Sequence, residues 1–208
     1  MKKIALLIST FILVITVAGC SSSEKNHKKD SETENKHTEN NESHNHKIPE
    51  HIFDKTMSNK TISEATMKKD IKTYLDSSRK LSDATEPYED KLDSDKKLSE
   101  KQQKNYDKVL NLRVQNDANF AKYIKNNKLP NKEYEKYSKK ISQYITTSND
   151  MDNKARSMSK KAEEKLDEDD LKEFKNIYKN IDIVNGREQD KIEKFLKKKN
   201  IETIAFDK

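Results

Sequence analysis

The spacing of the apolar residues constrains the fold of this chain more than any other feature. Beyond residue 60 they recur in steps of three and four with charged side chains between them, and the longest such stripe covers 131–166. This period places apolar side chains along one face of a helix. Only two glycines and three prolines occur in 208 residues, which argues against a turn-rich β-protein. The sequence therefore predicts an all-α fold, an elongated helical bundle or antiparallel coiled-coil hairpin of about four helices with a thin core.

Cap signatures predict where the first two helices of this bundle begin. Thr61 followed by Glu64, and Ser99 followed by Gln102, both fit a capping box. In this motif the N-cap hydroxyl and the side chain three residues later each accept a backbone N–H bond. Pro87 should end or kink the first helix, because its ring cannot continue the backbone ladder.

The later helices carry weaker boundary signals. Asn131 can cap the third helix, and the acidic run Asp167–Asp170 can begin a last long helix, since carboxylates are favourable at a helix N-terminus. Gly186 lowers helix propensity by about 1 kcal/mol relative to alanine, so a local kink is expected there. The segment Ile201–Phe206 is a short apolar tail that we expect to pack back on the bundle.

The first twenty residues have the order of a lipoprotein signal. Lysines follow Met1, and residues 4–17 form an apolar run broken by three hydroxyl residues. This run is shorter than the ~20 residues that a spanning helix needs. Val17, Ala18 and Gly19 then precede Cys20, a pattern that resembles the lipobox of bacterial lipoproteins. The resemblance implies cleavage before Cys20 and a diacylglyceryl group on its thiol. The alternative interpretation is an uncleaved signal anchor with an incidental cysteine.

These signals divide the chain into three parts. Residues 1–19 are the expected signal peptide, 20–47 the lipidated cysteine with a polar tether, and 48–208 the helical domain. The tether contains no aliphatic or aromatic residue after Cys20, so it cannot bury apolar surface and is predicted to be disordered. Two acyl chains would hold the protein at the extracytoplasmic face of the cell membrane.

All five histidines lie in or next to the tether. His44, His46 and His51 could bind Zn²⁺ or Cu²⁺ through their imidazole nitrogens. A structural metal site, however, needs four fixed ligands and supporting hydrogen bonds. We therefore expect the segment to act only as a polar tether, with weak metal binding as the alternative.

The charge pattern bears on the partners. The formal net charge is +6, and the charged residues, 38% of the chain, alternate in sign. This is typical of solvated helix faces with i,i+4 pairs. A positive excess can favour anionic wall polymers or lipid headgroups. We expect contact with the membrane through the lipid, a cell-wall polymer or envelope protein as partner, and no nucleic acid.

Catalytic signatures are missing from the sequence. The body has no histidine beyond His51, no second cysteine, no G-x-S-x-G, no H-E-x-x-H and no glycine-rich phosphate loop. We expect no enzyme and no cofactor apart from the covalent lipid on Cys20. Tyr134, Tyr137 and Tyr144 could form an aromatic groove for a sugar or peptide, but such a helical stripe is more often core.

The most unusual string of the body is Asn116-Asp117-Ala118-Asn119-Phe120. Helical spacing places Arg113, Asp117 and Phe120 on the apolar stripe with Asn116 beside them, and Arg113 can pair with Asp117 at i,i+4. One interpretation is a polar layer that fixes the register of the bundle. The other is a recognition spot formed by these four residues.

The signal, lipobox, polar tether, Lys/Asn-rich helical body and central Asn116-Asp117-x-x-Phe120 together resemble the staphylococcal NDxxF-motif lipoproteins. The resemblance covers essentially the whole chain. A looser similarity is to helical cell-wall-binding lipoproteins of the YkyA type. The resemblance implies a membrane-anchored envelope lipoprotein without an assigned activity, and it supplies no catalytic residues.

We therefore expect a non-enzymatic binding or scaffolding role. Two other functions stay open: weak metal capture by the histidines of the tether, and solute binding for a transporter. The solute-binding class usually has two α/β lobes, and this sequence shows neither strand patterns nor glycine turns.

Overall fold

The computed structural model describes residues 47–94, 96–162, 172, 176 and 181–206, all within one compact unit, His46–Lys208. The predicted signal peptide, the tether up to His46 and the acidic run at 167–170 lie outside the described residues. The described part contains four α-helices and no strand, which confirms the predicted all-α bundle. The helices are α2 (Glu64–Asp93), α3 (Glu100–Asn126), α4 (Lys132–Ala162) and α6 (Gly186–Lys198).

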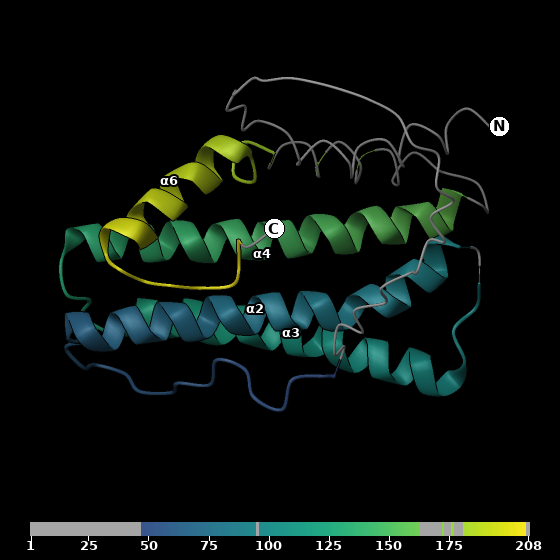
Figure 1. The fold of residues 1–208 in the computed structure, drawn as a ribbon, viewed down its shortest axis with the longest axis horizontal. Coiled ribbons are helices and arrows are strands. Elements are labelled where there is room, and N and C mark those ends of the chain that lie inside the picture. Colours follow the sequence, from purple (N-terminus) through teal and green to yellow (C-terminus); the bar gives the residue numbers. More distant parts are fainter. Residues whose placement is uncertain (1–46, 95, 163–171, 173–175, 177–180, 207–208) are drawn as a thin grey trace, which may run out of the picture. The chain divides into compact units, whose positions relative to one another are not determined.

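Neighbouring helices in the chain pack side by side (Figure 1). α2 packs against α3, α3 against α4, and α4 against α6. No helix of the described ranges is long and apolar enough to cross a membrane. The main core lies between α2, α3, α4 and α6, and its largest fully buried side chains include Tyr74, Tyr123, Tyr134, Phe53, Phe120 and Phe195.

Two predicted helix starts are confirmed. Ser99 Oγ accepts the Gln102 N–H at 3.4 Å, and Gln102 Oε1 accepts the Ser99 N–H at 3.0 Å, which completes the capping box. Asn131 Oδ1 accepts the N–H groups of Glu133 and Tyr134 at 3.0 and 3.2 Å. Both starts depend only on residues within one helical turn, and so they can be predicted from the local sequence.

The predicted start of α2 at Thr61 was wrong. The N-cap is Ser63, whose Oγ accepts the Thr66 N–H at 3.1 Å. Thr61 instead forms an isolated parallel bridge with Lys128, in which the Ile62 N–H donates to the Lys128 carbonyl at 2.9 Å. Because this pairing holds the backbone extended up to residue 62, the helix begins only after it.

Pro87 does not end α2, which continues through it to Asp93. Figure 1 shows the axis of α2 bending over its last turns, the usual effect of a proline ring inside a helix. Contacts with other helices hold these turns: the Tyr88 ring lies 5.6 Å from that of Tyr106, and Glu89 pairs with Arg156 at 2.9 Å. The stretch after Pro87 is therefore the end of α2.

Gly186 is also placed differently from the prediction. It is the first residue of α6, and the Asn185 side chain before it accepts the Glu188 N–H at 3.0 Å. The glycine therefore marks a helix start after an asparagine cap, where no kink is needed. At the other end, Asn200 takes a φ of 51°, and the Ile201 N–H reaches back to the Leu196 carbonyl, as in a Schellman motif.

The apolar tail packs back on the bundle, as predicted. Ile201 is buried, and Asp76 of α2 holds the residues after it. Asp76 Oδ1 accepts the Thr203 hydroxyl at 2.7 Å and the Ile204 N–H at 3.0 Å. Burial alone would raise the pKa of Asp76, but hydrogen bonds from Lys72, Thr203 and the Ile204 amide hold it below its ordinary value.

Replacing Asp76 by alanine should release the tail. The change removes the acceptor of both tail bonds and the partner of Lys72, so we expect a loss of roughly 1–2 kcal/mol in the free energy of unfolding. Thermal unfolding followed by circular dichroism measures this loss, and hydrogen exchange of the Ile204 amide reports the release directly. As a control, Asp190→Ala removes an exposed pair with Lys194 and should leave the melting temperature nearly unchanged. An Ile204 amide that stays as protected as in the wild type would contradict the expectation.

Candidate functional site

An extended segment, residues 48–61, lies along α2 and α3, and we call it the strap (Figure 1, dark blue). No part of the strap is helical. Ile48 and Ile52 pack against the smaller apolar cluster around Leu81 and Val109. The strap leads from the predicted tether into the helical domain, so it connects the two.

Asparagine side chains of α3, and Asn127 at its end, hold the backbone of the strap. Asn116 Oδ1 accepts the Phe53 N–H at 2.9 Å, and Asn119 Nδ2 donates to the Phe53 carbonyl at 2.8 Å. Asn127 Nδ2 donates to the Met57 carbonyl at 2.8 Å, and its Oδ1 accepts the Lys60 N–H at 3.0 Å. An amide side chain offers both a donor and an acceptor, so it can pair with a peptide backbone as another strand would.

Phe53 is the side chain that anchors the strap. It is 1% exposed and inserts between aromatic rings of α2 and α3. Its ring centroid lies 5.2 Å from that of Phe120, 5.3 Å from that of Tyr123 and 6.3 Å from that of Tyr74, all edge-on. Tyr74 and Phe120 stack on each other at 4.0 Å. Such edge-to-face and stacked pairs each add stability beyond the buried area.

A buried carboxylate binds the strap two residues further on. Asp70 of α2 is 1% exposed, and its Oδ1 lies 2.5 Å from Lys55 Nζ. Its Oδ2 accepts the Tyr123 hydroxyl at 2.5 Å. Burial, the hydrogen bond to Asp70 and its charge raise the pKa of Tyr123 well above its usual range. A carboxylate buried this deeply is costly unless its charge is paired, so Lys55 is the cation that the site requires.

Behind the aromatic pocket lies a polar layer that joins three helices. Asp117 Oδ1 accepts the Tyr74 hydroxyl at 2.8 Å, and its Oδ2 accepts Asn149 Nδ2 of α4 at 2.7 Å. Arg113 donates to Asn149 Oδ1 and reaches Asp152 Oδ2 at 3.3 Å. Arg113 and Asp117, whose i,i+4 spacing would allow a direct pair, are instead joined through Asn149.

Burial shifts the titration of this layer. It raises the pKa of Asp117, and the hydrogen bonds from Asn149 and Tyr74 together with the charge of Arg113 oppose that shift only in part. Burial also raises the pKa of Tyr74, as do the charge of Asp117 and the hydrogen bond to it. Tyr74 is thus a permanent donor at neutral pH, which fixes the direction of its hydrogen bond to Asp117.

The structure brings together the four residues predicted as a polar layer or recognition spot. Arg113, Asn116, Asp117 and Phe120 are all buried on the inner face of α3. Arg113 and Asp117 belong to the polar layer. Asn116 and Phe120 contact the strap, so these two side chains recognise a segment of the same chain.

Sequence reasoning missed the residues that complete this site. They are Phe53, Lys55, Asp70, Tyr74, Asn119, Asn127 and Asn149. A signal existed for Asn119, because asparagine is unfavourable inside a helix and Asn119 lies within α3.

The other predicted site residues have simpler outcomes. Cys20 with the lipobox residues 17–19, and also His44 and His46, lie outside the described residues. His51 is exposed, and the described part of the chain contains no cluster of three metal-binding side chains. Tyr134 and Tyr144 are core residues, and Tyr137 stacks on Phe195 of α6 at 4.4 Å, so these tyrosines form packing contacts and no groove.

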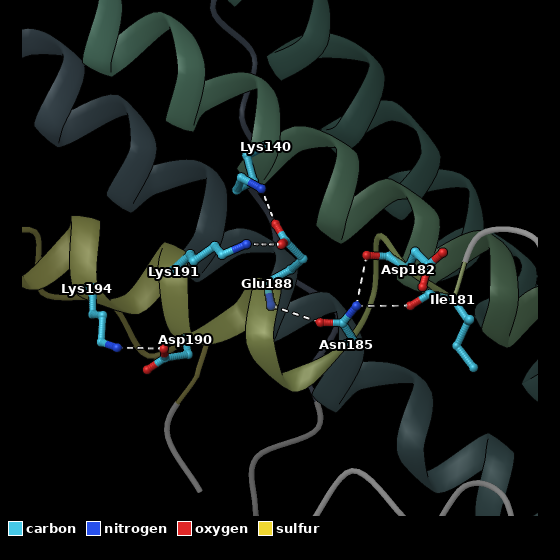
Figure 2. Close-up of polar contacts among 8 residues, drawn as sticks. All are labelled: Lys140, Ile181, Asp182, Asn185, Glu188, Asp190, Lys191 and Lys194. Atoms are coloured by element: carbon cyan, nitrogen blue, oxygen red, sulfur yellow. Dashed lines mark hydrogen bonds and ion pairs between the residues drawn. The ribbon is translucent and has the colours of Figure 1, made fainter.

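A second polar cluster fixes the start of α6 (Figure 2). The carboxylate of Glu188 pairs with Lys140 of α4 and Lys191 of α6. Hydrogen bonds from these two lysines lower the pKa of Glu188 to about 2. Asn185 Nδ2 donates to the Asp182 carbonyl at 2.8 Å. The carboxylate of Glu188 on α6 is thus bound to a lysine of α4, and the cluster attaches α6 to α4.

Comparison of the chain with models of protein families, with curated proteins and with solved structures finds no match. The case for a function therefore depends on the sequence signals and on the contacts described above.

The pH dependence of stability tests the buried carboxylate of Asp117. Its folded pKa lies above the ordinary value of 3.8, so the folded state binds more protons than the unfolded state between these two pH values. The unfolding free energy of the wild type, relative to that of Asp117→Asn, should fall as the pH rises through this window, by up to about 1.4 kcal/mol per pH unit.

Urea unfolding at closely spaced pH values measures this difference. Asp190→Asn, at an exposed position of α6, serves as the matched control and should track the wild type. A difference that stays flat or rises with pH would show that burial does not govern the titration of Asp117.

Proposed function

We propose that the chain is a membrane-anchored lipoprotein of the cell envelope, and that its helical domain acts by binding and without catalysis. The order of charge, apolar run, small residues and Cys20 supports the anchor. The observation that carries the binding role is the strap site, where side-chain amides and an aromatic pocket hold an extended backbone.

The chemistry of the buried groups fits binding better than catalysis. Asp70 and Asp117 are engaged with side chains of the chain itself, through Lys55 and Tyr123 in one case and Tyr74 and Asn149 in the other. A general acid or base must have its proton within reach of a substrate atom. These carboxylates lie under packed aromatic rings, so their role is to position and to bind.

The tether sets how far the domain can work from the membrane. If residues 21–47 are disordered, as the sequence predicts, a segment of this length spans roughly 30 Å, from 5–6 Å times the square root of its length. This reach would place the helical domain within the cell wall next to the membrane. Partners of the domain are accordingly proposed to be envelope components, either a wall polymer or the segment of another envelope protein.

Metabolic labelling with an alkyne-bearing palmitate analogue tests the anchor. In a bacterial host that processes lipoproteins, the wild-type chain should carry the label and partition into the detergent phase of Triton X-114. Cys20→Ala should lose the label and keep the signal segment, which mass spectrometry detects as the heavier chain. Cys20→Ala leaves the helical domain unchanged, so circular dichroism should be the same for both. An unlabelled wild-type chain in the aqueous phase would refute the anchor.

A further inference from the structure

We propose that the surface of α2 and α3 beneath the strap is a binding site for extended peptides with the pattern Phe-x-Lys. The strap is its occupant within the chain, and an unstructured segment of another envelope protein is its partner. This inference rests on the proposed binding role and names the ligand class for it. It does not depend on the lipid anchor.

Side-chain amides hold the backbone of the strap at several points. Asn116 accepts the N–H of Phe53, and Asn119 donates to its carbonyl. Asn127 forms hydrogen bonds with the backbone of Met57 and Lys60. Contacts of this kind accept any extended backbone, whatever its sequence. Peptide-binding proteins commonly use main-chain hydrogen bonds for affinity and pockets for alternate side chains for specificity.

Two pockets beneath the strap give the site its specificity. In an extended chain, alternate side chains point to the same side, so Phe53 and Lys55 face the domain together while Asp54 points to solvent and is exposed. The aromatic pocket takes the phenylalanine, and the buried Asp70 takes the lysine. Without a cation Asp70 would be an unpaired buried charge, so a replacement ligand must carry a basic group at this position.

Only a small part of the strap is buried against the helices. Its half from Asp54 to Thr61 is exposed apart from Lys55, and Met57 is 42% exposed although it is apolar. Phe53 is the only fully buried side chain of the strap. The strap lies outside every helix of the bundle, so its departure removes no helix, and it opens the aromatic pocket together with the binding groups of Asn116 and Asp70.

Covalent connection favours the strap over any free peptide. A tethered occupant acts at a millimolar effective concentration when its linker is short, so a partner has to compete with it. Weakening the strap within the full chain should therefore reveal the site, because the competitor is removed while the pockets remain.

Fluorescence anisotropy with a labelled peptide of residues 48–61 tests the proposal. The full mature chain from residue 20, made soluble by Cys20→Ser, is compared with the same chain carrying Phe53→Ala. The Phe53→Ala chain should bind the peptide at least tenfold more tightly than the wild type. Peptides in which alanine replaces Phe53, or glutamate replaces Lys55, should bind at least tenfold more weakly.

A pair of α3 variants separates specific binding from general loosening. Asn119→Ala, added to the Phe53→Ala chain, should weaken peptide binding at least threefold because it removes the donor to the peptide carbonyl. Asn111→Ala, at an exposed position of the same helix, should leave the affinity unchanged. A folded Phe53→Ala chain that does not bind the peptide, or that binds a scrambled peptide equally well, would overturn the proposal.

If the Phe53→Ala chain loses its helical circular dichroism signal, a second measurement tests the proposal without this variant. A protease site placed at the exposed residues 56–58 allows the strap of the otherwise wild-type chain to be cut after folding. The labelled peptide should then displace the cut strap while the helical signal stays. Unfolding upon displacement would overturn the proposal. A wild-type dimer that Phe53→Ala abolishes would also overturn it, since the partner would then be a second copy that exchanges straps.

Discussion

Asn116 is the residue at which the core and the strap meet, and the rest of the site depends on its buried amide. Its side chain is fully buried, which costs several kcal/mol unless both ends are hydrogen-bonded. Oδ1 accepts the Phe53 N–H, and Nδ2 donates to Ser78 Oγ at 2.9 Å. One amide thus ties the strap to α2 and α3 at once. The anchoring of Phe53 and the ion pair of Lys55 with Asp70 follow from the register that this amide sets.

Helix ends could be predicted where they depend on neighbouring residues alone. The capping box at Ser99 and the cap at Asn131 are of this kind, and the heptad-like period predicted the bundle itself. The start of α2 was missed because Lys128, far away in sequence, pairs with the backbone before it. Pro87 was expected to end or kink α2, and contacts with Tyr106 of α3 and Arg156 of α4 show why the helix continues beyond the bend.

The site, like the helix ends, could be predicted only where it depends on residues close together in sequence. Four α3 residues singled out from the sequence do lie together, but their roles come from partners on other elements: Asn116 bonds to a backbone group 63 positions away. The strap has one fully buried anchor and few other apolar residues, so no regular apolar period marks it. The role of the spacing between Phe53 and Lys55 becomes clear only from the position of Asp70, which pairs with Lys55. A polar layer and a recognition spot were weighed as alternatives. Asp117 belongs to a polar layer, and Asn116 and Phe120 on adjacent turns of the same helix contact the strap.

Hydrogen exchange at the Phe53 amide of the full chain tests the central claim most directly. If the strap is a releasable occupant, this amide should be protected by Asn116 and yet exchange well before the core amides of α3 around Tyr123, because local opening needs less free energy than global unfolding. Exchange of the Phe53 and Tyr123 amides at the same rate, with the same dependence on urea, would mean that the strap leaves only when the whole domain unfolds. That result would contradict the account.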